Sequence, residues 1–505
     1  MVLQKEFSES IVRHLAPLTS GILLAVSFLW SGTLWWVALI AFVPLFFFLA
    51  SVRTTGGACI GAWIAGFLGF GGSFLWYWNT LPLDWLGVPS LEKGILYVGI
   101  GWFLTTFVLS FSVGLWGVAA RHILRKNRFW WTLLLVPLLW VFFEYGRAWS
   151  YSLLTYGVGV AFGPYFTVGF LGYLLAHHPL LLQLASVGSV YLLSVVVVFC
   201  NVCCFGIATR SQLSPLRRAL LISMLVAAVV GTSFIPVPEK EEKGKPVVVA
   251  ALHTNFPPSL SVFRSGQEAA NKAYRDLAFK AGHAMSAPDI VVFPEDTRFL
   301  AGLLEQGKAE AFVADAFGAA RPFIIDSGRV VDKENKPRSR LLYYDSATQT
   351  LTTRDKVFLA PQGEYVPKLF SFIVGLFGDS TLKLEQSRTY YPGSVETVGR
   401  QGDIVAGGLF CSEMFSPRLY GILKDKEANL LVNVTSHAWF HNSRLLYSEF
   451  KAAAQVRAVE NRLPLVVAAN VSPSFAVNSY GRVIGETEWG KPSILTIKLF
   501  LNTSN

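Results

Sequence analysis

The sequence predicts a protein in two parts, a membrane α-helical bundle of about seven spans followed by an α/β domain. Charge is divided very unevenly, because residues 1–236 carry 17 of the 76 charged side chains and residues 237–505 carry the other 59. The first part consists largely of apolar runs near the length of about 20 residues that a spanning helix needs. In the second part, short β-branched runs alternate with helical segments, a pattern typical of sheets covered by helices.

Seven apolar runs account for the predicted bundle. The first run leads directly into the second without a cleavage site of the A-x-A type, so we expect no cleaved signal sequence. The first and fifth runs are shorter than a full span. The runs lie near residues 15–30, 34–51, 58–79, 94–119, 129–143, 179–208 and 219–235.

The basic residues of the short connecting segments predict the orientation, because cytoplasmic loops are enriched in Lys and Arg. With a cytoplasmic N-terminus, only Lys93 and Arg147 fall on the outer side, and an odd number of spans places everything after Pro236 outside. The net charge of +10 reflects this topology. We expect no nucleic-acid partner, since the second part has no basic patch interleaved with aromatics. The basic residues on the inner side are Lys5, Arg13, Arg53, Arg121, Arg125, Lys126, Arg128, Arg210, Arg217 and Arg218.

A charged, proline-bounded linker at residues 236–246 marks the exit from the membrane, so we divide the chain into domains of residues 1–236 and 237–505. The apolar strands after the linker show no clear alternation, which indicates burial on both faces. The expected strands are 247–253, 289–294, 322–326, 404–410, 430–435, 465–470 and 494–501. The expected helices are 266–284, 301–318 and 445–462, with a short helix after residue 410.

Cys411 is the only one of the five cysteines in the second part, so no disulfide can form within that domain. It follows an apolar strand at a predicted helix start, where unpaired N–H groups and the helix dipole favour the thiolate. Glu295 follows another strand, and Lys356 and Glu364 come from a third segment. A thiol, an ammonium and carboxylates at the ends of strands predict an acyl-transfer site.

These residues also have structural interpretations. In isolation, Cys411 would be a small core residue, and Glu364 and Glu413 could belong to surface ion pairs. The Glu, Lys and strand-end context of Cys411 favours a chemical role. Arg457 and Glu460 lie three residues apart on a predicted helix, and we interpret them as a structural pair.

Four segments, taken in order, resemble the signature regions of the nitrilase, or carbon-nitrogen hydrolase, superfamily: residues 293–295, 356–367, 411–413 and 457–461. The apolar spans, the Gly-Glu-Tyr-Val-Pro end of the second segment and the Ala-Trp-Phe at residues 438–440 narrow the resemblance to bacterial apolipoprotein N-acyltransferases, as a divergent member. It implies an αββα sandwich on the periplasmic side of the inner membrane. It also implies acyl transfer from a phospholipid to the α-amine of the diacylglyceryl-cysteine that begins a lipoprotein.

The chemistry implied by this resemblance is ping-pong, through a thioester on Cys411. Glu295 would take the thiol proton, protonate the leaving alkoxide and later accept a proton from the incoming amine. Lys356 would stabilise the oxyanion together with the backbone N–H of Ser412.

Further residues are expected to shape the pocket. Glu364 and, by the resemblance, Glu413 would orient Lys356. Residues 366–378 are too apolar for an exposed loop and too short to span, so we predict a lid that dips into the membrane surface, with packing onto the sandwich as the alternative. A second flap is expected around residue 256, and residues 148–175 could line a lateral entry. The expected substrate and lid contacts are Phe263, Phe370, Phe372 and Trp439.

The sequence departs from the family pattern around the predicted acyl pocket. Ser412 replaces a Tyr, Gln362 replaces a Phe, and Ser436-His437 replaces Asn-Asp. The family usually ends in an eighth span, whereas we predict a final strand here. Two alternative functions therefore stay open: a membrane-tethered amidase, and a catalytically silent relative that binds lipoproteins. We expect no cofactor and no metal, because the one H-x-x-x-H pair, His437 and His441, flanks two aromatics in a predicted loop.

Overall fold

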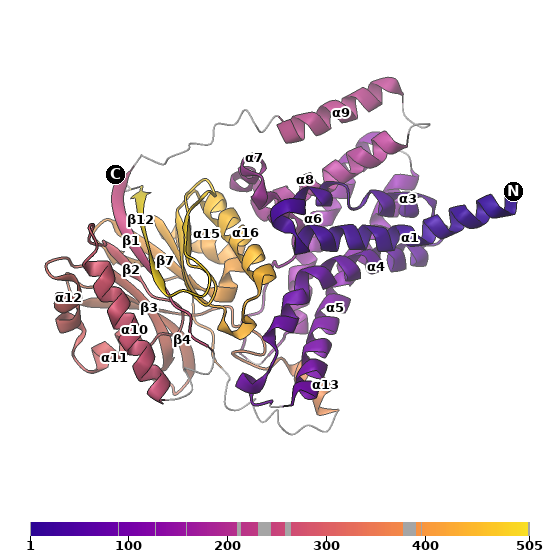
Figure 1. The fold of residues 1–505 in the computed structure, drawn as a ribbon. Helices are drawn as coiled ribbons and strands as arrows, with labels where there is room; N and C mark the ends of the chain where they lie inside the picture. Colours follow the sequence, from indigo (N-terminus) through magenta and orange to yellow (C-terminus); the bar gives the residue numbers. More distant parts are fainter. Residues whose placement is uncertain are drawn as a thin grey trace.

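The computed structural model describes residues 2–88, 90–126, 128–157, 159–209, 214–230, 244–257, 264–376, 390–394 and 396–502. Its first half is helical and its second half contains the strands, and the two halves lie side by side (Figure 1). The predicted domain boundary at residue 236 lies outside the described residues and stays a prediction.

Close packing between apolar helices holds the first half together. Small residues let the helix backbones approach, as is common where no aqueous driving force brings helices together. A Cβ atom on Gly117 of α5 would lie 2.3 Å from the Cβ of Ala62 on α4. The helical elements are α1 (Val2–Leu29), α2 (Ser31–Leu34), η1 (Trp35–Leu39), α3 (Val43–Ser51), α4 (Thr55–Ser73), η2 (Phe74–Thr80), η3 (Asp84–Leu86), α5 (Leu91–Arg125), α6 (Phe129–Leu154), η4 (Leu171–His177), α7 (Pro179–Leu182), α8 (Ala185–Ala208) and α9 (Pro215–Val230).

Four stretches of the described chain are long and apolar enough to cross a membrane, so the expected count of about seven spans is not confirmed. They are Ser31–Ser51, Thr55–Thr80, Leu91–Arg125 and Ala185–Ala208, and a shorter apolar stretch covers Leu15–Leu29. The fifth predicted run is part of α6, a helix of 26 residues that contains Glu144 and Arg147. The seventh corresponds to α9, which has 16 residues.

Two six-stranded sheets form the centre of the second half. One has the order β12-β1-β2-β3-β4-β5 and the other β11-β10-β9-β8-β7-β6. In each sheet three central strands run parallel, β1-β2-β3 and β7-β8-β9, and the outer pairs are antiparallel. The strands are β1 (Lys245–His253), β2 (Ile290–Val292), β3 (Phe323–Val331), β4 (Pro337–Asp345), β5 (Thr350–Asp355), β6 (Gly399–Gln401), β7 (Ile404–Phe410), β8 (Leu430–Ser436), β9 (Leu465–Asn470), β10 (Phe475–Val477), β11 (Val483–Glu486) and β12 (Ser493–Leu501).

The sheets face each other across an apolar core and carry helices on their outer faces. Val249 and Ile325 of the first sheet and Val432 and Val466 of the second are fully buried in the same cluster. This αββα order confirms the predicted fold class. The outer helices are α10 (Arg264–Gly282), α11 (Phe299–Glu305) and α12 (Ala309–Phe317) on the first sheet, and α15 (Pro417–Asp425) and α16 (Arg444–Asn461) on the second (Figure 1).

The predicted elements agree with the structure where strands are fully apolar. The bounds of β7 and β9 match the prediction, and α10, α16 and β12 begin within two residues of it. The predicted helix at 301–318 is two helices, α11 and α12. The prediction missed β4, β5, β6, β10 and β11. Of these, β6 and β10 have only three residues each, and β5 has exposed or partly exposed residues along most of its length, so its sequence resembles a polar loop.

Helix α16 joins the two halves through buried polar contacts. Glu460 accepts hydrogen bonds from Ser189 Oγ at 2.5 Å and from the Val190 N–H at 3.0 Å, where α8 is broken by non-helical backbone. Arg457 forms the predicted ion pair with Glu460 at 3.0 Å. Glu449, two turns earlier, accepts a hydrogen bond from Ser73 of α4 at 2.6 Å. These contacts fix the sheets against the membrane helices.

Candidate active site

Glu295 is positioned by a tight turn that follows β2. Asp296 and Arg298 have left-handed backbone angles, with φ of 61° and 58°. The Asp296 N–H donates to Ser327 Oγ at 2.9 Å, and the Arg298 N–H donates to the Ser327 carbonyl at 3.0 Å. Such conformations are costly for residues other than glycine and persist where surrounding bonds impose them. The turn therefore holds the Glu295 side chain at the edge of the first sheet.

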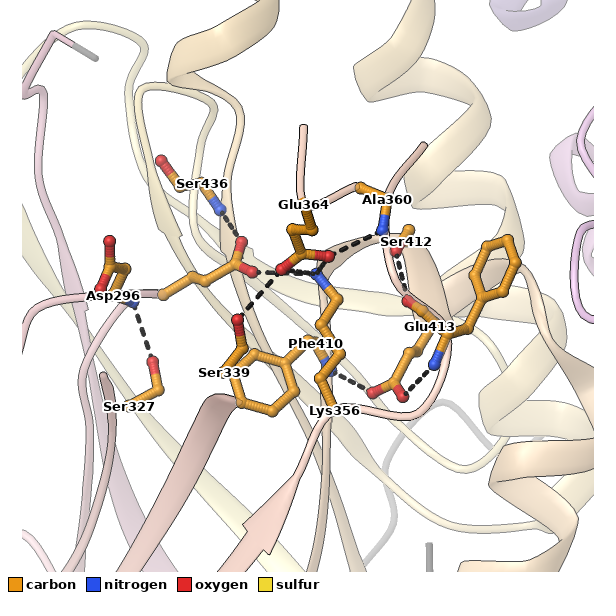
Figure 2. Close-up of polar contacts among 12 residues, drawn as sticks. Asp296, Ser327, Ser339, Lys356, Ala360, Glu364, Phe410, Ser412, Glu413 and Ser436 are labelled. Atoms are coloured by element: carbon orange, nitrogen blue, oxygen red, sulfur yellow. Dashed lines mark hydrogen bonds and ion pairs between the residues drawn. The ribbon is translucent and has the colours of Figure 1, made fainter. Parts of the chain in front are cut away.

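Lys356 is placed between two carboxylates (Figure 2). It directly follows β5, and its N–H donates to the Ser339 carbonyl at 2.8 Å. Its Nζ lies 3.2 Å from Glu295 Oε1 and 3.1 Å from Glu364 Oε1. Its side chain is 2% exposed, so the ammonium is held by these carboxylates rather than by solvent. The structure thus brings together three of the predicted site residues.

Each carboxylate is fixed by further hydrogen bonds. Glu295 Oε2 accepts from the Ser436 N–H at 3.0 Å. Glu364 accepts from the Ala360 N–H at 2.7 Å and from Ser339 Oγ at 3.1 Å (Figure 2). Glu364 is therefore fixed in place where it contacts Lys356.

Cys411 is the first residue of η8 (Cys411–Phe415), a 3-10 helix of five residues that follows β7. Glu413 of this helix contacts different groups from those expected. It is fully buried in an ion pair with Arg354 at 3.1 Å and accepts from the N–H groups of Val357 at 2.7 Å and Phe410 at 2.9 Å. Glu413 therefore fixes the backbone on either side of the site, whereas Glu364 and Glu295 hold Lys356.

Cys411 stands at a helix start, as the sequence predicts, but burial opposes the thiolate that this position favours. The pKa of Cys411 is raised to about 12, chiefly by burial and then by Glu295, while Lys356 opposes the shift in part. Burial also raises the pKa of Glu295 from 4.5, opposed by Lys356 and reinforced by Glu364. Burial opposes the charged form of Lys356, but Glu295 and Glu364 outweigh it and raise its pKa. At neutral pH the sulfur is a thiol, so its attack requires a base.

A cavity of about 240 Å³ connects these residues to the helical half. Glu295, Lys356 and Cys411 line one end. The opposite wall is apolar and aromatic, from η2, α5, α6 and the segment that follows α6, and includes Trp76, Val98, Leu104, Leu154 and Phe166. The last two belong to the stretch 148–175 that was expected to line an entry.

The predicted lid contacts separate into three groups. Phe370, on α13 (Lys368–Gly375), lines the cavity and packs 6.4 Å from Tyr97, ring centroid to centroid. Phe372, on the same helix, is 65% exposed and does not line the cavity. Trp439 lines the cavity and packs against Trp85 at 4.7 Å. Phe263 lies outside the described residues.

The residues that depart from the family pattern surround this cavity. Gln362, Ser412, Ser436 and His437 all line it. Ser412 Oγ donates to the Phe358 carbonyl at 3.2 Å, so its hydroxyl is engaged by the backbone. Burial lowers the pKa of His437 to about 4, and its ring packs edge-on against Phe450 at 4.9 Å. His437 therefore contributes an uncharged imidazole ring to the wall of the cavity.

Sequence reasoning missed three polar residues of the site, Ser339, Arg354 and Arg329. Ser339 and Arg354 lie on β4 and β5, which were not predicted, and Arg329 lies at the end of β3 beyond its predicted limit. The one signal for these residues in the sequence was the position of Arg354, a charged residue two places before Lys356. The structure shows that Arg354 is buried.

Comparisons with known proteins agree with both halves of the chain. Residues 20–203 match the family "Apolipoprotein N-acyltransferase N-terminal domain", and residues 282–504 match the family "Carbon-nitrogen hydrolase". The apolipoprotein N-acyltransferase of Geobacter metallireducens is 29% identical over 507 residues, covering 95% of this chain and 88% of that protein. The one from Agrobacterium fabrum is 26% identical over 79% of each chain.

Among solved structures, Saccharomyces cerevisiae Nit3, a member of the nitrilase superfamily, covers 52% of this chain and 93% of its own length, with 14% identity and a TM-score of 0.39. The two family matches follow each other along the chain in the order of the helical and α/β halves described above. The relative from Geobacter metallireducens extends across both. Over nearly its whole length the chain is therefore similar to apolipoprotein N-acyltransferases, with a match to their N-terminal domain followed by a match to the carbon-nitrogen hydrolases.

Proposed function

We propose that the protein transfers an acyl chain from a phospholipid to the α-amine of the diacylglyceryl-cysteine at the N-terminus of a lipoprotein, through a thioester on Cys411. One observation carries this proposal. Glu295, Lys356 and Cys411 line the same cavity as apolar side chains of α5 and α6. A lipid whose tail lies along those helices can present its ester to the sulfur.

In the first half-reaction, Glu295 takes the proton of Cys411 as the sulfur attacks the ester carbonyl carbon. The carbonyl oxygen becomes an oxyanion, stabilised by the Lys356 ammonium and the backbone N–H of Ser412. Collapse of the intermediate breaks the bond to the glycerol oxygen, and Glu295 returns its proton to that alkoxide. The lyso-phospholipid leaves, and Glu295 is again ionised beside the thioester.

In the second half-reaction, the lipoprotein amine attacks the thioester carbonyl. Glu295 accepts the proton that the amine must lose, and the carbon–sulfur bond breaks to give the amide. The proton on Glu295 then returns to the Cys411 sulfur, which restores the resting thiol. Lys356 keeps its proton throughout, because Glu295 and Glu364 favour its charged form.

The apolar wall explains why an acyltransferase is favoured over the tethered amidase. An amidase acting on small amides has no use for a cavity lined by Val98, Leu104 and Leu154. A thioester also has to survive until the amine arrives, and an apolar cavity occupied by lipid limits the access of water.

We also propose that the protein lies in a bacterial inner membrane with a cytoplasmic N-terminus and a periplasmic α/β part. The bias of basic residues toward one side of the apolar runs supports this orientation.

The test is to incubate the purified full chain with a phospholipid and to record its intact mass. We expect one added acyl chain on the wild type and none on Cys411→Ser. Addition of a diacylated lipopeptide should remove the adduct and yield a triacylated product. No adduct with any phospholipid would contradict the proposal, release of ammonia from small amides would favour the amidase, and lipopeptide binding without chemistry would favour the silent relative.

A further inference from the structure

Arg329 is a charged residue of the cavity that the mechanism above does not use. It lies at the end of β3, directly opposite Ser339 of β4 in the strand register. Ser339 in turn donates to Glu364, the carboxylate that holds Lys356. Arg329 and Ser339 both line the cavity together with Cys411. A guanidinium is thus placed at the polar end of a cavity whose other walls are apolar.

The guanidinium of Arg329 is held from one side only. Its Nε lies 2.9 Å from Asp296 Oδ2, and its charged group lies over the ring of Tyr390 at 5.5 Å from the centroid. Within the part of the chain that the structure describes, no other side chain or carbonyl accepts a hydrogen bond from it. The side chain is 36% exposed, so its remaining N–H groups are free to bind a ligand.

The distribution of charge favours an anion at this place. Asp296 is shared by two arginines, Arg298 at 2.9 Å and Arg329 at 2.9 Å, which leaves one positive charge in excess. Lys356 is shared by two carboxylates, which leaves one negative charge in excess when both are ionised. Arg329 lies beside this cluster, across from Ser339 in the strand register, and it is the cation lining the cavity that is paired with a single carboxylate.

We propose that Arg329 binds the phosphate group of the donor lipid while the ester of that lipid lies at Cys411. The proposal rests on the function proposed above and specifies how its donor is selected. Only a glycerol backbone separates the phosphate from the ester carbonyls of such a lipid, so both groups fit within one cavity. The planar guanidinium offers paired donors that match two phosphate oxygens. The acyl chains then extend along α5 and α6.

Arg298 offers a matched control for this proposal. It shares Asp296 with Arg329, it is 34% exposed, and it does not line the cavity. Arg298→Met and Arg329→Met therefore remove the same charge from the same ion-pair cluster, and only the second removes it from the cavity. Acylation of Cys411 is followed by intact mass in uncharged detergent micelles. The donor is either phosphatidylglycerol or a diacylglycerol with the same chains.

We expect the wild type and Arg298→Met to be acylated faster by phosphatidylglycerol than by diacylglycerol. In Arg329→Met that preference should fall by about tenfold to a hundredfold, the usual effect of losing hydrogen bonds to a charged group, while acylation by diacylglycerol continues. An equal loss with both donors, or the same loss in Arg298→Met, would overturn the proposal. Absence of any adduct on the wild type would instead contradict the proposed function.

Free phosphate presents the same oxygens as a lipid headgroup, so a second measurement separates the two. Inorganic phosphate is added to wild type and Arg329→Met during acylation by diacylglycerol. We expect no change in rate, because the free ion lacks the chains that anchor a phosphate beside Arg329. Inhibition of the wild type that disappears in Arg329→Met would assign the subsite to the free ion and overturn the lipid assignment.

Discussion

Glu295 accepts and then donates the proton in both proposed half-reactions. Its pKa should therefore set how the acylation rate falls at low pH. Burial raises that pKa from 4.5, Lys356 lowers it and Glu364 raises it. Only the ionised carboxylate can accept the thiol proton. Acylation should therefore slow as the pH falls through the pKa of Glu295, at a pH above 4.5.

Removing the charge of Glu364 gives a prediction with a definite sign. Glu364→Gln removes one of the groups that raise the pKa of Glu295, so the acid limb of acylation should move to lower pH. The measurement is the rate of adduct formation on Cys411 as a function of pH. Glu268→Gln, an exposed residue of α10, is the control. A limb that stays in place or moves to higher pH would show that Glu295 does not titrate in this step.

At the scale of elements, α16 carries a buried carboxyl group at the contact between the two halves. Burial raises the pKa of Glu449 from 4.5 to about 8, and Ser73 lowers it in part. The fold therefore favours the protonated form. The stability that this preference contributes is complete below pH 4.5 and is lost as the pH rises to about 8.

Glu449→Gln should abolish this loss, because an amide accepts the same hydrogen bond from Ser73 and cannot ionise. We expect the variant to unfold at a temperature a few degrees above that of the wild type at pH 8, with the difference shrinking toward pH 5. Thermal unfolding of the full chain in detergent measures it, with Glu268→Gln as the exposed control. A difference independent of pH would show that Glu449 is ionised in the fold.

Helix α13 carries two phenylalanines in different environments, which allows the role of the cavity wall to be tested separately from that of the exposed surface. Phe370 lines the cavity and Phe372 is exposed. Phe370→Ala enlarges the space for an acyl chain, so the preference among donors should shift toward longer or bulkier chains by up to about tenfold. Phe372→Ala should leave that preference unchanged. Competition between donors of different chain length, read as the mass of the Cys411 adduct, measures both, and equal shifts would remove Phe370 from the acyl pocket.

At the scale of the whole molecule, the proposed orientation predicts which surfaces face outward. Met285 of the α/β part is fully exposed, and Lys126 follows the end of α5 on the predicted inner side. In intact spheroplasts, an impermeant maleimide should label Met285→Cys above the background of the native cysteines. Lys126→Cys should be labelled only after permeabilisation. The opposite pattern would reverse the orientation.

Particular strands show why much of the fold could be predicted. The apolar runs that became β7 and β9 are buried on both faces, so their sequence alone distinguishes them from loops. The polar β5 forms because β4 pairs with it, which is a tertiary event. Apolar runs also do not show how the charged residues near them are accommodated: Glu144 and Arg147 of α6 contact Leu171 and Val168 within the folded protein.

By itself the sequence determined the two-part architecture and the grouping of Glu295, Lys356 and Cys411. Spanning helices and buried strands follow from local hydrophobicity, and a functional side chain at the end of a strand is recognisable from its neighbours. Only the tertiary structure decided that Glu413 pairs with Arg354, that Cys411 is buried beside Glu295 and Lys356, and that Arg329 lines the cavity. Charge interactions depend on distance and burial among segments far apart in the chain, and folding alone brings those segments together.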